Sequence, residues 1–190
     1  MKTHSRPLAG ILGLAVLSSS LLFVPACKSV TDEEIKAAME IEIIETKWVE
    51  KDYKQWPRPK LVLVPAVVFR IKNLTAEPMK YVNFNGIFKE KDAIENVGDQ
   101  FLAAIRNEPV AAGGWSEPIT LRSNFGYEGT SLANFKNNPG FKPLWVKIYA
   151  QWKGSRHVLL GDWPVSMTID FKEPGIPVIQ GGKPVEPIKK

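Results

Sequence analysis

Few side chains in this sequence could carry out chemistry, and the first of them is its single cysteine, Cys27. Residues 1–6 carry two positive charges and no negative charge, and residues 8–23 are mostly apolar. Small residues then lead to Cys27. This order is typical of an export signal, and the apolar segment is shorter than the ~20 residues that a membrane-spanning helix requires.

The residues Val24-Pro25-Ala26-Cys27 resemble the lipobox of bacterial lipoproteins. That resemblance implies a signal peptide over residues 1–26 and a thioether-linked lipid on Cys27, which would anchor the protein to a membrane by acyl chains. An ordinary secretory signal and an uncleaved anchor are the alternatives. The residue after the cysteine is Lys28, not the aspartate that marks inner-membrane retention in lipoproteins of enteric type. We therefore expect a cell-envelope protein, on the periplasmic face of the outer membrane.

Histidine chemistry is the next candidate, because a serine or cysteine nucleophile needs an imidazole to take its proton. Once residues 1–26 are removed, His157 alone could supply one. It follows Gly154-Ser155-Arg156, a sequence typical of a hairpin turn, so we expect an exposed histidine and not a general base. The formal net charge of +5 falls further when Lys2 and Arg6 leave, which argues against a nucleic-acid partner.

Carboxylates are the remaining option for catalysis or metal binding. Glu90, Asp92, Glu95 and Asp99 form a loose acidic segment, but they lack the alternating ligands and the glycine of a dedicated calcium loop. Zinc prefers clustered cysteine and histidine ligands, which this sequence does not offer. We expect no metal, no cofactor and no enzyme activity. An envelope hydrolase that uses these carboxylates alone is the second alternative for function.

Hydrophobic periodicity then predicts the elements that would position any site. Residues 61–72 are apolar on both faces for much of their length, which predicts a central strand with Pro65 at a bulge or bend. Residues 79–90 alternate, which favours one long strand bulged at Gly86 over a tight turn at Asn85-Gly86. Further strands are expected at residues 41–49, 100–105, 115–122, 144–152, 157–163 and 165–171.

This pattern of about 7–8 short strands separated by Pro, Gly and Asn predicts an all-β fold over residues 41–172, an immunoglobulin-like sandwich of two antiparallel sheets. Residues 27–40 are expected to be a lipidated tether or a short helix capped by Thr31. Residues 173–190 are rich in Pro and Gly and predict an extended or disordered tail.

Three segments carry a family resemblance. Residues 67–75 read Val-Val-Phe-Arg-Ile-Lys-Asn-Leu-Thr, residues 81–84 read Tyr-Val-Asn-Phe, and residues 112–121 place Ala-Gly-Gly-Trp before Ile-Thr-Leu. Together they resemble the immunoglobulin-like domains of bacterial envelope lipoproteins, including the FxLYD type. The resemblance covers roughly residues 41–171. It implies a non-catalytic accessory or interaction domain outside the cytoplasmic membrane, and it assigns no catalytic residues.

Aromatic side chains are the candidates for partner binding. Trp145 and Tyr149 share the more polar face of one predicted strand, whereas Trp152 falls with the apolar residues of the core face. The long connection 123–141 carries four more aromatics, which would either bind a partner or close one end of the sandwich. The candidate contact residues are therefore Trp145, Tyr149, Phe125, Tyr127, Phe135 and Phe141.

These features predict a non-catalytic, lipid-anchored accessory or binding protein of the bacterial cell envelope, whose partner is an envelope protein or a glycan. A carbohydrate or cell-wall binding module that uses exposed aromatics is the first alternative, because a ring beside polar groups suits a sugar as well as a protein.

Overall fold

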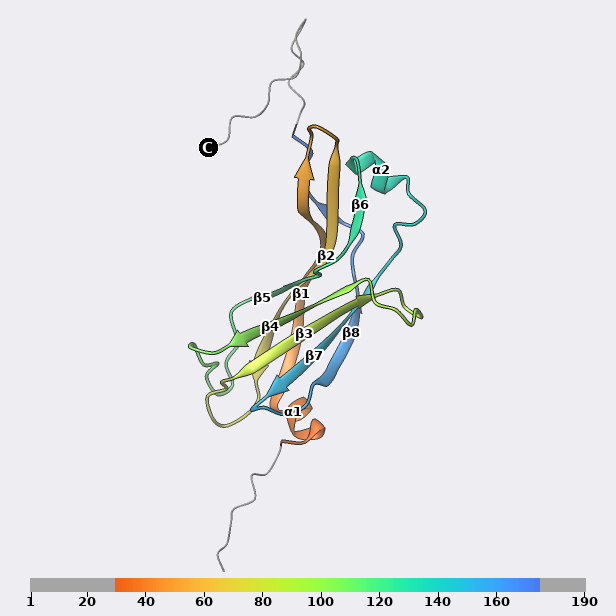
Figure 1. Cartoon of the computed structure of the whole chain (residues 1–190). Coiled ribbons are helices and arrows are strands. Elements are labelled where there is room, and N and C mark those ends of the chain that lie inside the picture. The colour runs from red at the N-terminus through yellow and green to blue at the C-terminus, as the bar shows by residue number, and fades with distance from the viewer. Residues whose placement is uncertain (1–29, 175–190) are drawn as a thin grey trace, which may run out of the picture.

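The structure is a computed structural model that describes residues 30–174. Cys27, the expected signal peptide and the tail from residue 175 onward lie outside the described residues. Within them the fold is an all-β sandwich, as predicted, with nine strands in two sheets and two short helices (Figure 1).

The first sheet has five strands in the order β5-β2-β1-β9, with β6 also paired to β2. The strand β2 is central, as the two-sided apolar sequence predicts, and β9 runs parallel to β1, so the sheet is mixed. The bounds are β1 Met39–Lys54, β2 Lys60–Asn73, β5 Ile119–Arg122, β6 Tyr127–Gly129 and β9 Ile169–Asp170.

The second sheet is antiparallel and has the order β4-β3-β7-β8. Its inward side chains alternate strictly with outward ones along β3 and β7, as expected for strands with one buried face. The bounds are β3 Val82–Lys89, β4 Gly98–Ile105, β7 Trp145–Trp152 and β8 Val158–Pro164.

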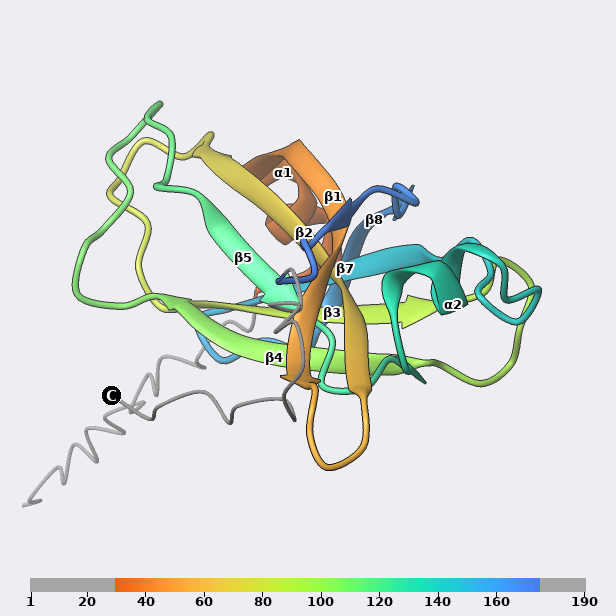
Figure 2. The same ribbon diagram turned by 90° about the horizontal axis from the view of Figure 1, so that it is seen from above.

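The hydrophobic core fills the space between the two sheets. Phe69 of β2 meets Phe84 of β3 edge to face, with ring centroids 5.1 Å apart, and both side chains are fully buried. Trp152 also belongs to this core, as predicted, and its indole Nε1 donates to the carbonyl of Lys80. The sheets approach each other at one side, where β4 lies beside β5 (Figure 2).

The helix α1 (Asp32–Ala38) covers one end of the sandwich. Thr31 caps it in a capping box with Glu34, and Ile35 buries its side chain completely. Asp32 also pairs with Arg156, which follows the β7–β8 turn. Residues 32–38 are thus the short helix, not the tether, of the two forms expected for this segment.

The strands β1 and β2 form a long hairpin that projects beyond the rest of the sandwich (Figure 1). Two register irregularities, at Ile43/Glu45 and Glu50/Asp52, interrupt its ladder. Trp56 lies at the hairpin tip and is 64% exposed. The α2 helix (Leu132–Lys136) lies beside this hairpin, next to β6.

Three expectations about strands were wrong. Gly86 pairs regularly with Gln100 and Ile148, so β3 has no bulge there; a Cβ on Gly86 would lie 3.0 Å from the Leu121 side chain, so the glycine permits close packing of the sheets. Residues 115–118 join the first sheet by only one bridge, at Trp115. Of the strand expected over 165–171, only Ile169–Asp170 has strand geometry.

Candidate binding groove

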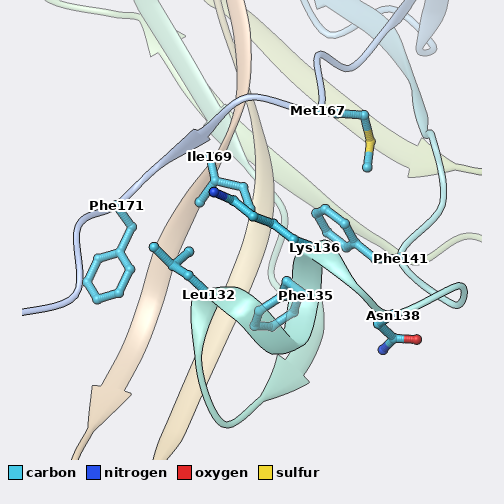
Figure 3. A pocket seen from close by; sticks show the side chains of 8 residues that line it. All are labelled: Leu132, Phe135, Lys136, Asn138, Phe141, Met167, Ile169 and Phe171. Carbon is cyan, nitrogen blue, oxygen red and sulfur yellow. The ribbon is translucent and has the colours of Figure 1, made fainter.

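An apolar groove lies between α2 and the chain that leads into and out of β9 (Figure 3). We call it the α2–β9 groove, and its volume is about 360 Å³. Eight side chains line it: Leu132, Phe135, Lys136, Asn138, Phe141, Met167, Ile169 and Phe171. The lining is thus apolar, with one cation and one amide.

The wall formed by α2 is fixed by local hydrogen bonds. The strand β6 pairs with the start of β2, and Ser131 then caps α2 by accepting from the backbone N–H of Asn134. Phe135 is buried, and its ring comes within 2.9 Å of where a Cβ on Gly129 would lie. Glycine at this position therefore lets the helix pack closely against β6.

The opposite wall is held by β9. Its residues Ile169 and Asp170 pair in parallel with Trp48 and Val49 of β1. The carboxylate of Glu173 then accepts from the backbone N–H of Leu132 at 2.6 Å, which ties the segment after β9 to the first turn of α2. Both walls are therefore bound to one another as well as to the sandwich.

Trp48 contacts both walls of the groove. Its backbone N–H donates to the carbonyl of Thr168 on the β9 side, at 2.8 Å. Its fully buried ring lies 4.5 Å from the Phe141 centroid and 5.6 Å from that of Tyr127, on the α2 side. Burial raises the pKa of the Tyr127 phenol, and the charge of Glu90 raises this pKa further.

The predicted contact residues separate into three places. Tyr127 and Phe141 pack against Trp48, and Phe135 packs against Phe141, so the three close this end of the sandwich. Phe135 and Phe141 also line the groove. Phe125 is 66% exposed and lies apart, with the Lys51 ammonium 5.7 Å from its ring.

The other two predicted residues lie elsewhere on the molecule. Trp145 and Tyr149 share the outer face of β7, as the alternation predicts, and both are half-buried. The Lys91 ammonium lies 5.4 Å from the Trp145 ring. Within residues 30–174, neither Trp145 nor Tyr149 forms a ring contact with the aromatic residues of the groove.

Met167, Ile169 and Phe171 are groove residues that sequence reasoning did not assign to a site. Their alternate spacing at i, i+2 and i+4 indicates one shared face, and this spacing was the available signal. By itself this spacing predicts only a strand, because nothing in the local sequence shows that α2 lies opposite.

Candidate catalytic groups are dispersed in the structure. His157 is exposed, with its ring 6.0 Å from that of Phe101. Glu90 pairs with Lys142, whereas Asp99 accepts from Asn124. Within residues 30–174, no group of three or more His, Cys, Asp or Glu side chains is arranged to hold a metal ion.

The fold and groove define an all-β sandwich with an apolar groove at one end. No family model and no curated protein matches the sequence. Among solved structures, a structural-genomics target is 10% identical, with a TM-score of 0.39, over 78% of this chain and 97% of its own. A Bordetella pertussis protein provisionally named ApaA is 11% identical, with a TM-score of 0.36, over 68% of this chain and 93% of its own.

Residues 30–174 contain two helices, α1 and α2. Neither α1 nor α2 has the length and apolar character needed to cross a bilayer.

Proposed function

We propose that this protein is a non-catalytic binding protein of the bacterial cell envelope, tethered by a lipid on Cys27, which holds an extended apolar segment of a partner protein in the α2–β9 groove. The observation that carries the proposal is the composition of the groove. Six of its lining side chains are apolar, and Lys136 is its one titratable group among the described residues.

The groove chemistry supports a peptide over a sugar. A sugar presents hydroxyl groups in several directions and needs donors and acceptors around it, whereas this lining offers only Lys136 and Asn138. Leu, Met, Ile and Phe side chains instead match the apolar side chains of a peptide. Met167 is 41% exposed at the groove, so its apolar surface is available to such a partner.

The groove chemistry also supports binding over hydrolysis. Among the described residues no carboxylate lines the α2–β9 groove, and Glu173, which lies nearby, accepts from the Leu132 backbone N–H. General acid–base catalysis needs a group that can exchange a proton with the substrate. The lysine at the rim is better placed to pair with an acidic residue flanking the apolar segment.

A photocrosslinking amino acid at Met167 tests the proposal in intact cells. We expect a covalent adduct with one envelope protein, identified by mass spectrometry of the crosslinked peptide as an extended apolar segment. The matched control carries the same amino acid at Ile94, which is 99% exposed and does not line the groove. This control should give no such adduct.

A blocking substitution makes the test specific to the groove. Lys136→Trp places a large ring at the exposed rim without removing a core side chain, and we expect it to abolish the Met167 adduct. Equal crosslinking from Met167 and Ile94, or an adduct that persists in Lys136→Trp, would contradict peptide binding here.

A further inference from the structure

A second groove, separate from the first, lies where β4 meets the end of β5. We call it the β4–β5 groove; its volume is about 600 Å³, and it shares no lining residue with the α2–β9 groove. Figure 2 shows these two strands side by side, each from a different sheet. The side chains that matter to its chemistry are Lys51, Asp99, Gln100, Phe101, Arg122 and Asn124.

Hydrogen bonds between β4 and the end of β5, including the residues that follow it, fix the shape of the groove. The Arg122 backbone N–H donates to Gln100 Oε1, and the Asn124 backbone N–H donates to the Asp99 carbonyl at 3.0 Å. Asn124 Oδ1 accepts in return from the Asp99 backbone. A Cβ on Gly98 would lie 2.2 Å from Ser123 Oγ, so glycine is needed for this close approach.

The two cations in the groove have no carboxylate partner among the described residues. Lys51 Nζ donates to the carbonyl of Asn124, and Arg122 Nη2 donates to the carbonyl of Glu50 at 2.7 Å. Neither forms an ion pair within residues 30–174. Backbone carbonyls position these side chains without neutralising them. The two cations outnumber the one carboxylate of the lining, Asp99, so the field of the groove favours an anionic ligand.

Two exposed phenylalanine rings lie at this groove, one in its lining and one beside Lys51. Phe101 lines the groove and is 53% exposed, and Phe125, beside Lys51, is 66% exposed. An exposed Phe leaves a large apolar plate in water, which a sugar ring or an aromatic side chain could cover. Asp99, Gln100 and Asn124 also line the groove. Gln100 Oε1 and Asn124 Oδ1 already accept from backbone N–H groups, so Gln100 Nε2 and Asp99 Oδ2 are the polar atoms left for a ligand among the described residues.

We infer that the β4–β5 groove binds an acidic saccharide, a glycan that carries carboxylate groups. The cations would pair with the carboxylates, the Phe rings would cover the apolar faces of the sugar rings, and the amides would meet the hydroxyl groups. An acidic peptide would use the cations equally well. It would bring fewer hydroxyl groups to Gln100 Nε2 and Asp99 Oδ2, which have no hydrogen-bond partner within residues 30–174, and this is why we favour the saccharide.

Calorimetry with the full-length, detergent-solubilised protein tests this inference. The probe is a peptidoglycan glycan strand freed of its peptides, which carries lactyl carboxylates, and its matched counterpart is chitohexaose, which has a similar backbone without them. We expect the first to bind more tightly, and its affinity to fall as salt is raised. Equal binding of the two, or binding of neither, would overturn the inference, as would binding of poly-glutamate alone.

Substitutions assign the binding to this groove. We expect Phe125→Ala and Lys51→Gln each to weaken glycan binding by about three- to tenfold. Trp56→Ala is the matched control, since its ring is 64% exposed but lies at the hairpin tip. A control that loses as much affinity as Phe125→Ala would place the glycan elsewhere. Because Met167 and Lys136 lie outside this groove, the result is independent of the crosslinking test.

Discussion

The side chain of Asn73 joins several segments of the chain by hydrogen bonds. It is completely buried at the end of β2, and its Nδ2 donates to the carbonyls of Glu77, Val110 and Ala111. Its Oδ1 accepts from the backbone and hydroxyl of Thr75. The Asn-Leu-Thr sequence predicts such turn chemistry, but the links to residues 110 and 111 come from a distant part of the chain.

We expect Asn73→Ala to lower the free energy of unfolding by about 2–3 kcal/mol, because carbonyls buried around it lose their donor. Asn85→Ala is the matched control: Asn85 Oδ1 is buried without a hydrogen-bond partner among the described residues, so its removal should cost little. Urea unfolding of both variants measures the difference. Equal destabilisation would contradict the role given to Asn73.

Gly126 is a second position at which a single added carbon would disrupt the packing. A Cβ there would lie 2.0 Å from the carbonyl oxygen of Leu63, which belongs to the β2 backbone and cannot easily move. We expect Gly126→Ala to destabilise the fold by about 1–3 kcal/mol or more, because the overpacking must displace β2 or the 123–126 segment. Gly140→Ala, whose Cβ would meet only the Asn138 side chain, should stay within about 0.5 kcal/mol of wild type in thermal unfolding.

For the proposed contact residues, the sequence predicts on which face of a strand each side chain lies. It does not predict whether that side chain is exposed to solvent. Alternation along one strand correctly places Trp145 and Tyr149 on the outer face and Trp152 in the core. Whether an outer-face ring is covered depends on side chains such as Lys91, which come from another segment. Phe101 shows the reverse case, since nothing local distinguishes its exposed ring from a buried one.

At the scale of elements, long strands could be predicted and short ones could not. The strands β2, β3 and β7 each carry eight or more residues, so alternation or a two-sided apolar pattern is visible in the sequence. The elements β6 and α2 have three and five residues, less than is needed to show a period. The strand β6 is stabilised by pairing with β2 and by the contact of Tyr127 with Trp48, both distant in sequence, and α2 packs against β6.

The element β9 is linked to β1 by an ion pair whose strength changes with pH. Lys47 Nζ lies 2.8 Å from Asp170 Oδ2, and the hydrogen bond to Lys47 lowers the pKa of the Asp170 carboxyl. A lowered folded-state pKa means that the pair stabilises β9 above the unfolded value of about 4. This contribution is lost as the pH falls below that value toward the folded-state pKa.

We therefore expect Asp170→Asn to lower Tm at pH 6, and this difference from wild type to shrink as the pH falls below about 4. Thermal unfolding monitored by circular dichroism from about pH 2.5 to about pH 7 measures it. Asp162→Asn removes a comparable exposed carboxylate that has no ion pair among the described residues. A pH-independent Tm difference for Asp170→Asn would show that the pair with Lys47 does not stabilise β9.

At the scale of the whole molecule, the two grooves and α1 occupy different regions. The described residues begin at Val30, next to α1. The hairpin tip and α2 lie at the opposite end of the molecule (Figure 1). If Cys27 carries the proposed lipid, α1 lies close to the membrane and the α2–β9 groove faces away from it. Such an arrangement would present the groove to partners away from the anchoring membrane.

The lipid itself gives the last prediction. We expect the wild-type protein to incorporate labelled palmitate, to begin at Cys27 by mass spectrometry, and to accumulate as a precursor when globomycin blocks signal cleavage. Cys27→Ser should lose the label and the membrane fraction, whereas Ser29→Ala, two residues away, should keep both. An unmodified Cys27 in the wild-type protein would rule out the anchor and, with it, the orientation that places the groove away from the membrane. It would leave both groove chemistries intact, because they depend only on residues 30–174.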